Sequence, residues 1–388
     1  MATSNSVITL RRHDLDNLRT GLTGLVVFHH TAIAYGGVGD GTRARLVPFT
    51  ARMPSMPLAS FNAYNQSFFM GLFFWLSGYF SAQSLARHDK AGGSRWAFVR
   101  DKAKRLALPA VVYTLTIMPA QKAMVLPEWT ADSVRTCLVT HFRTLRGVQG
   151  ATWYLATLFI FDVAAACILP SQEHFSEEKK SKKKSEKNCL YENLGRYAWI
   201  PVSAASFFIR IKFPVGKTTR PLGLQLAYAS QYIFAYSMGY FSVSKGQQWL
   251  SGPFTPGVEP RGGGNGGGWN TSAAAYAVWN EISFSIIGPA IMVHFYKWYN
   301  KATESTLWKP RYSYATFLIH DFVIVAVQTA LDAALVGSGK APQWVSSELW
   351  KAVGPVFMTV VAGAFNSVVS FTVAKALIDN VSWLRKFI

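Results

Sequence analysis

Two side chains that can do chemistry share the first apolar stretch of the chain. Residues 14–35 read DLDNLRTGLTGLVVFHHTAIAY and place Arg19 and His30 among apolar neighbours. The two residues are eleven positions apart, which puts them on one face of a helix, about three turns and about 16 Å apart. Ionisable side chains in a membrane segment are costly and are usually paired and functional. Neutral histidine is a common general base, so this face predicts proton transfer at His30.

The spacing of two neighbouring residues indicates a different role for each of them. Asp16 precedes Arg19 by three positions, so its carboxylate can pair with the guanidinium across one turn, and we count it with the candidate catalytic residues. His29 is rotated by about 100° from His30 around a helix. We therefore expect His29 to face another part of the bundle and to have a structural role.

Later stretches add further candidate side chains. Trp153 opens the segment WYLATLFIF, where we expect it near the substrate at a membrane interface. The segment SYATFLIHD ends with His320 and Asp321. Asp321 must pair inward, because a carboxylate that faces lipid is expensive. His320 can lie in the acceptor site, support another site residue, or simply pack against the first helix.

The composition decides which kind of chain holds these residues. Of 388 residues, 50% are hydrophobic and only 15% are charged, well below the roughly 25% charged residues of soluble domains. Apolar runs near the length of about 20 residues needed to cross a bilayer recur along the sequence. We predict an all-α fold, a polytopic transmembrane helix bundle of about nine to ten crossings that forms one domain over residues 1–388. The legible segments lie at about 18–35, 65–85, 106–126, 153–170, 197–213, 222–243, 271–296, 312–335 and 353–378.

Basic residues orient this bundle. Short basic loops mark the cytosolic side of a membrane protein, so Arg11 and Arg12 predict a cytosolic N-terminus. The basic segment 87–105 and the charged segment 171–195 are expected on the same side, whereas the polar loop 127–150 is expected outside. Nine crossings would place the basic loop 297–311 outside as well. One extra or missing crossing between about 197 and 271, a range that includes the Gly-rich linker at 252–268, would return that loop to the cytosol.

Several functions are disfavoured by the same features. The net charge of +19 is explained by cytosolic flanks rather than by nucleic-acid binding, so we expect no nucleic-acid partner. Cys137, Cys167 and Cys189 have no metal-ligand spacing, and we expect no metal centre. The stretch GGGNGGG has no following lysine and helix, so it is not a phosphate-binding loop.

Taken in order, the motifs of residues 14–330 resemble the membrane-bound acyltransferase type 3 family. The resemblance is carried by the Arg19–His30 spacing, FFWLSGY in the second segment, RDKAKRLALP after it, WYL, and SYATFLIH. The basic motif departs from the family pattern because Lys102 stands where the first arginine of an RxxR pair would be, with Arg105 as the second and Arg100 nearby. The Gly-rich stretch departs as well, because it stands where most relatives have a hydrophobic crossing.

The resemblance implies a membrane O-acyltransferase, with no bound cofactor and with acyl-CoA as co-substrate. The acyl group, often acetyl in this family, would pass to a hydroxyl of a lipid, glycan or secondary metabolite. His30 would act as the base, with Arg19 holding the donor or the thioester oxygen. A cluster of Arg100, Lys102 and Arg105 would bind the phosphates of CoA by charge-assisted hydrogen bonds, while His320 and Trp153 would contact the acceptor.

Two alternatives remain open on the sequence. The same residues suit CoA-independent acid–base chemistry, such as cyclisation of a lipidic or terpenoid natural product. A transporter is the other alternative, although the sequence has no pair of matching Gly- or Pro-broken segments that would indicate inverted repeats.

Overall fold

The structure is a computed structural model that describes residues 11–37, 55–126, 128–169, 197–245, 268–336, 347–382 and 384, and their secondary structure is helical. The predicted all-α fold is thereby confirmed. The predicted charged segment 171–195 lies outside the described residues, and so does the Gly-rich linker 252–268 except for Gly268.

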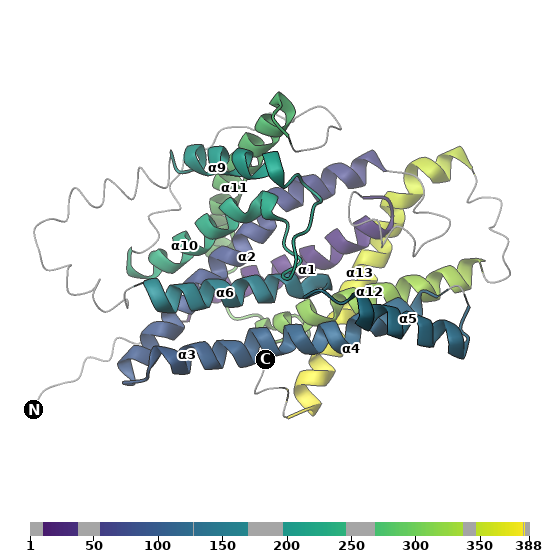
Figure 1. Cartoon of the computed structure of the whole chain (residues 1–388), viewed down its shortest axis with the longest axis horizontal. Helices are drawn as coiled ribbons and strands as arrows, with labels where there is room; N and C mark the ends of the chain where they lie inside the picture. The colour runs from purple at the N-terminus through teal and green to yellow at the C-terminus, as the bar shows by residue number, and fades with distance from the viewer. Residues whose placement is uncertain are drawn as a thin grey trace, which may run out of the picture.

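Helix α1 (His13–Ala34) carries the central pair and runs through the middle of the bundle (Figure 1), where it contacts α2 (Met56–Lys90), α11 (Thr271–Trp298), α12 (Pro310–Val336) and α13 (Glu348–Asn380). It begins five positions before the predicted Leu18. Asp14 and Asp16 lie in its first turn, where acidic side chains favour the positive end of the helix dipole.

The second predicted crossing is longer than expected, and it packs closely on α10 (Ala229–Lys245). Two glycines allow this contact. A Cβ added at Gly78 would lie 2.1 Å from the carbonyl oxygen of Tyr236, and one added at Gly239 would lie 1.9 Å from that of Trp75. Gly78 and Gly239 therefore serve close packing between α2 and α10.

The third predicted crossing begins earlier, inside the basic segment. Helix α3 (Arg95–Lys102) leads through a π-helical turn (Ala103–Ala107) into α4 (Leu108–Met124). The side chain of Ser94 accepts a hydrogen bond from the backbone N–H of Ala97 and so caps the start of α3.

The prediction of a polar loop over 127–150 was wrong, because residues Ala131–Thr144 form helix α5. Thr130 caps this helix by accepting a hydrogen bond from the N–H of Ser133. His141 fixes it to α4: its Nε2 donates to the carbonyl oxygen of Thr114 (3.1 Å), and its Nδ1 accepts from Lys122 (3.1 Å). Burial, together with the charge of Lys122, lowers the pKa of His141, so the imidazole can remain neutral and accept from the ammonium. Because α5 is short and amphipathic, its pattern was not recognised among the apolar runs.

The remaining predicted crossings follow the predicted ranges. Helix α6 (Trp153–Ile168) and helix α9 (Trp199–Lys212) correspond to the fourth and fifth. Four helical segments among the described residues are long and apolar enough to cross a membrane, namely Gly150–Ile168, Thr271–Trp298, Pro310–Leu331 and Glu348–Asn380. This is the pattern of an integral, multi-pass membrane protein.

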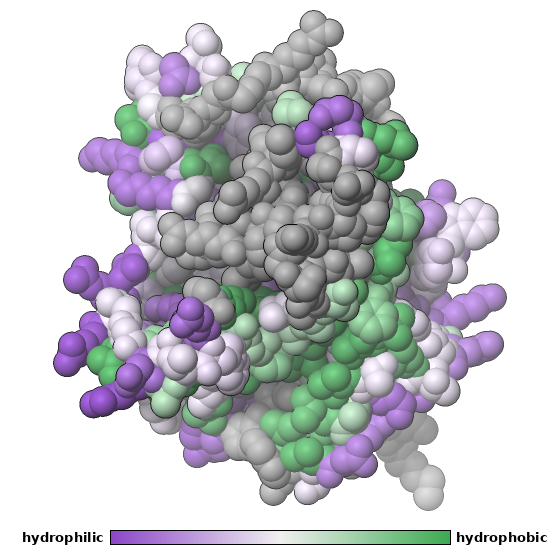
Figure 2. All heavy atoms as spheres, turned by 90° about the vertical axis from the view of Figure 1, so that its right-hand side faces the viewer, coloured by the Kyte–Doolittle hydropathy of each residue, from purple (hydrophilic) through white to green (hydrophobic). Residues whose placement is uncertain are grey.

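Apolar side chains also lie on the surface of these helices. On α13 the exposed ones include Leu349, Val353, Phe357 and Val360. Figure 2 views the molecule from the end where α5 lies and shows hydrophobic residues gathered below and to the right of the centre, with hydrophilic residues towards the left and right edges. A lipid environment accounts for such an exposed apolar surface.

The loop between α11 and α12 lies beside the start of α1. The side chain of Asn17 donates to the carbonyl oxygens of Tyr299 (2.7 Å) and Lys301 (2.9 Å). The basic loop 297–311 is therefore at the same end of the bundle as Arg11 and Arg12. An even number of crossings between them would place both on one side of the membrane.

Candidate active site

Three ionisable side chains from two helices meet at the deep end of α1. His30 lies on α1, and His320 and Asp321 are consecutive on α12. The Nδ1 atom of His30 is 2.8 Å from Oδ1 of Asp321 and 2.8 Å from Nε2 of His320. His320 is fully buried and Asp321 is nearly so, whereas 19% of the His30 side chain is exposed. We call these three residues the His30 cluster.

The hydrogen bonds assign the protons in this cluster. Nδ1 of His320 is 2.6 Å from the carbonyl oxygen of Phe317, which only accepts, so this nitrogen carries the proton. A neutral His320 then has an unprotonated Nε2 that accepts from Nδ1–H of His30, and Asp321 accepts from the same N–H. In this arrangement Nε2 is the basic nitrogen of His30. Asp321 stabilises the imidazolium that forms when His30 takes up a proton.

The same cluster contains atoms of the types that ligate metal ions. One ligand atom each from His30, His320 and Asp321 lies within 4.8 Å of the others. Two imidazole nitrogens on one tetrahedral Zn²⁺, at about 2.0–2.1 Å each, would be separated by about 3.3 Å. The observed separation of 2.8 Å between the two histidines is instead a hydrogen-bond distance. The geometry is that of a hydrogen-bonded pair, which suits proton transfer.

His29 faces a different neighbour, as its register predicts. Its ring lies 4.9 Å from that of Phe69 on α2, measured between ring centroids, and the residue is buried. The His30 ring faces His320 on α12, with centroids 4.8 Å apart. The two adjacent imidazoles of α1 therefore contact two different helices, α2 and α12.

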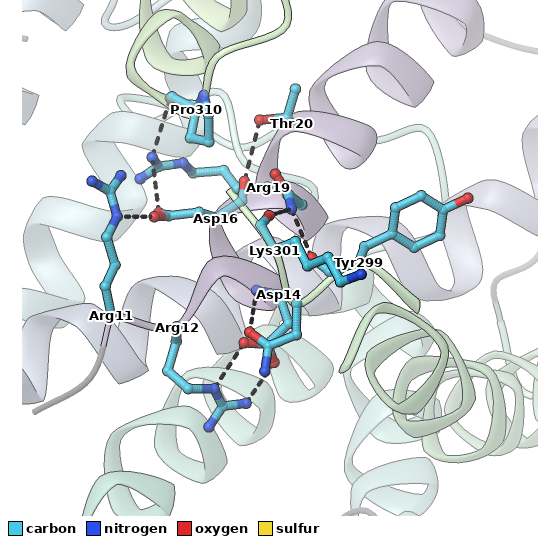
Figure 3. A network of polar contacts seen from close by, with 11 residues as sticks. Arg11, Arg12, Asp14, Asp16, Arg19, Thr20, Tyr299, Lys301 and Pro310 are labelled. Atoms are coloured by element: carbon cyan, nitrogen blue, oxygen red, sulfur yellow. Dashed lines mark hydrogen bonds and ion pairs between the residues drawn. The ribbon is translucent and has the colours of Figure 1, made fainter. Parts of the chain in front are cut away.

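At the opposite end of α1, Arg19 belongs to a network of charged and carbonyl groups (Figure 3). Its guanidinium donates to the carbonyl oxygen of Pro310 (3.1 Å) and lies 3.6 Å from the carboxylate of Asp16. Arg11 approaches the same carboxylate more closely, at 2.8 Å. The predicted pairing of Asp16 with Arg19 is confirmed, but Asp16 lies at this end of the helix rather than beside His30.

A second ion pair holds the start of this helix. Arg12 donates twice to Asp14, at 2.8 and 2.6 Å, and this hydrogen bonding raises the pKa of Arg12 above its usual value. The N–H of Asp14 in turn donates to the side chain of Asn300 (3.2 Å). Figure 3 shows both ion pairs around the first turns of α1.

The three basic residues predicted to bind the donor differ in whether their side chains are exposed. Arg100 and Arg105 are exposed. The backbone carbonyl of Arg105 accepts a hydrogen bond from the hydroxyl of Tyr314. Lys102 points inward, with its ammonium 2.9 Å from a carboxylate oxygen of Asp162, a residue with no exposed surface.

Aromatic side chains extend from the His30 cluster towards α2 and α6. The ring of Phe317 lies 5.6 Å from that of His320 and 5.4 Å from that of Tyr154. The hydroxyl of Tyr154 is in turn hydrogen-bonded to that of Ser77 on α2 (2.6 Å). Trp153 stacks beside Tyr232 at 5.8 Å. The predicted substrate residue Trp153 thus belongs to the same aromatic group, since its ring also lies 6.3 Å from that of Tyr154.

The structure brings together only some of the residues predicted for the site. His30 and His320 are in direct contact, whereas Arg19 and Asp16 are about three or four turns away along α1. Asp321 was expected to pair inward, and it does, but its contact with His30 was not foreseen. Asp162 was missed altogether, although a carboxylate in the apolar stretch TWYLATLFIFD was a usable signal.

Comparison with known proteins gave one match. Residues 12–375 match a family described as an acyltransferase domain, type 3. No curated protein and no solved structure matched the chain.

Proposed function

We propose a specific reaction for this chain, which belongs to the acyltransferase 3 family and is an acyltransferase enzyme. In this reaction it transfers an acyl group from acyl-CoA to a hydroxyl of a lipid, glycan or secondary metabolite. The contact between His30 and Asp321 carries this proposal, because it supplies an oriented base on the helix that also holds Arg19. Membership of an acyltransferase family favours acyl transfer over the two alternatives, acid–base cyclisation and transport.

The His30 cluster would activate the acceptor. Nε2 of His30 takes the hydroxyl proton while the acceptor oxygen attacks the carbonyl carbon of the thioester. The bond from carbon to sulfur then breaks, and the imidazolium returns its proton to the departing thiolate of CoA. Asp321 favours the charged form of His30 in between.

The donor would enter from the other end of α1. Arg105 and Arg100 are exposed cations that can bind the phosphates of CoA by charge-assisted hydrogen bonds. Arg19 is about 16 Å from His30 along the helix. It therefore suits a contact with the middle of the donor better than a contact with the thioester oxygen. The extended arm of CoA would carry the thioester from this end towards His30.

Turnover by the purified protein in lipid nanodiscs tests the proposal. Acetyl-CoA is supplied with a panel of hydroxylated lipids, sugars and small alcohols, and release of free CoA is followed with a thiol reagent. We expect acceptor-dependent release that the variant His30→Ala does not show. Equal release by wild type and by His30→Ala, or labelled acetyl-CoA that is never bound, would overturn the proposal.

A further inference from the structure

Four helices meet at one buried ion pair outside the His30 cluster. The ammonium of Lys102 on α3 lies 2.9 Å from Asp162 on α6 and donates to the hydroxyl of Ser81 on α2 at 2.6 Å. The hydroxyl of Tyr236 on α10 donates to the other carboxylate oxygen of Asp162, also at 2.6 Å. We call these four residues the Lys102 anchor.

The burial of Asp162 decides what Lys102 can do. A carboxylate without exposed surface is tolerated when a cation and hydrogen-bond donors compensate its charge. If the ammonium of Lys102 turned outward to a phosphate, Asp162 would lose its cation. The nearby ring of Phe98, 5.2 Å from the ammonium, also favours the inward position. Lys102 is therefore held in the anchor and is not available as a donor ligand.

The Lys102 anchor lies directly before a change in the backbone geometry. Lys102 is the last residue of α3, and the π-helical turn Ala103–Ala107 follows at once. Such turns are rare in helices and frequently mark functional sites. Inside this turn, the carbonyl of Arg105 accepts a hydrogen bond from Tyr314 on α12. The turn is thus held by the anchor before it and by α12 within it.

We infer that Lys102 and Asp162 are positioning residues that fix the π-helical turn so that Arg105 faces the donor beside Arg19. The inference rests on the proposed function, in which Arg105 binds acyl-CoA. It assigns different roles to the two members of the basic pair, since one ties the turn to the bundle and the other contacts the donor.

Replacement of Asp162 distinguishes a positioning role of Lys102 from direct binding of the donor by Lys102. The variant Asp162→Asn keeps the shape and the contact with Tyr236 but removes the charge that holds Lys102. If Lys102 positions Arg105, Asp162→Asn and Lys102→Gln should both weaken equilibrium binding of acetyl-CoA by about tenfold, as loss of a charge-assisted contact would. If Lys102 is a ligand, Asp162→Asn should release it and tighten binding, which would overturn the inference. Unchanged binding in both folded variants would overturn it too.

A second set of variants guards against misfolding. Removing both members of a buried ion pair is often tolerated when removing one is not, so Lys102→Met is combined with Asp162→Asn. In this background Arg105→Ala should add little further loss of affinity, because Arg105 is already misplaced; full additivity would contradict the inference. Lys104→Gln changes an exposed neighbour and serves as the matched control, with unchanged affinity expected.

A readout without acyl-CoA distinguishes failure of this inference from failure of the proposed function. Amide hydrogen exchange over residues 103–107 should become faster in Asp162→Asn, while exchange over α13 should not change. If the wild-type protein does not bind acetyl-CoA, and exchange over 103–107 is still faster in Asp162→Asn than in wild type, the donor role is rejected. The role of the Lys102 anchor in fixing the turn is then retained. Unchanged exchange over 103–107 would reject the anchor.

Discussion

His30 and Asp321 are 291 positions apart in the chain, and yet the imidazole and the carboxylate are joined by a contact of 2.8 Å between α1 and α12. The contact lies in an apolar bundle, and the carboxylate is almost completely buried. In such surroundings, the pair combines a base with the charge that stabilises its protonated form.

Substitution of the base is the first test of this arrangement. We expect His30→Ala to lower the turnover rate by about 10²–10⁴, the usual contribution of a general base. His29→Ala should be much milder, because that ring packs against Phe69 instead. Rates are measured per folded molecule, after size-exclusion chromatography in detergent. Equal losses for the two variants would mean that the assignment of His30 as the base is wrong.

The second prediction concerns Asp321. Asp321→Asn preserves the shape of the side chain but removes the charge beside His30, and we expect turnover to fall by about tenfold or more. Removing one member of a buried pair also costs stability, about 3–5 kcal/mol in measured cases. The thermal unfolding midpoint is therefore recorded with the rate. A variant that loses stability but keeps full activity per folded molecule would show that Asp321 has only a structural role.

Arg19 gives a third prediction. Arg19→Lys keeps the charge but loses the planar set of donors that reaches both Pro310 and Asp16. We expect kcat/KM for acetyl-CoA to fall by about tenfold, because hydrogen bonds to charged groups contribute about 1.5–3 kcal/mol. Asp16→Asn should have a smaller effect, since its carboxylate orients Arg19 and lies far from His30. A larger loss for Asp16→Asn than for Arg19→Lys would favour a catalytic carboxylate at this end.

The fourth prediction distinguishes binding of the donor from binding of the acceptor. Arg105→Ala should raise the KM for acetyl-CoA by about tenfold and leave the KM for the acceptor nearly unchanged, because Arg105 is an exposed cation outside the His30 cluster. The loss should shrink at high ionic strength, where contacts between exposed charges are screened. The measurement is a pair of saturation curves at low and high salt. A rise confined to the acceptor KM would place the donor elsewhere.

Removal of metal ions is the fifth test. Since the two imidazoles of the His30 cluster are at hydrogen-bond distance from each other, we expect activity to survive dialysis against EDTA. The control is His320→Ala in the same buffer, which should lose activity because Nδ1 of His30 loses its contact with Nε2 of His320. Loss of wild-type activity on chelation, restored by Zn²⁺, would instead identify the cluster as a metal centre.

Much of the local structure could be predicted from the amino-acid order. Apolar runs gave the predicted ranges of α9, α11, α12 and α13, because a membrane segment is defined by local length and hydropathy. The register of α1 correctly separated the directions of His29 and His30, since a helix turns by a constant angle per residue. The ordered motifs also indicated the family.

The tertiary structure decided which of these faces meet. Periodicity shows that α12 carries His320 and Asp321, but only the packing of α12 against α1 places Asp321 at His30. Likewise, RDKAKR reads as a uniform row of cations, and Lys102 is distinguished from Arg105 only because the buried carboxylate of Asp162 on α6 draws its ammonium inward. Spacing along the sequence fixes the direction of a side chain on its own helix, whereas its partner is fixed by contacts between helices that are distant in the chain.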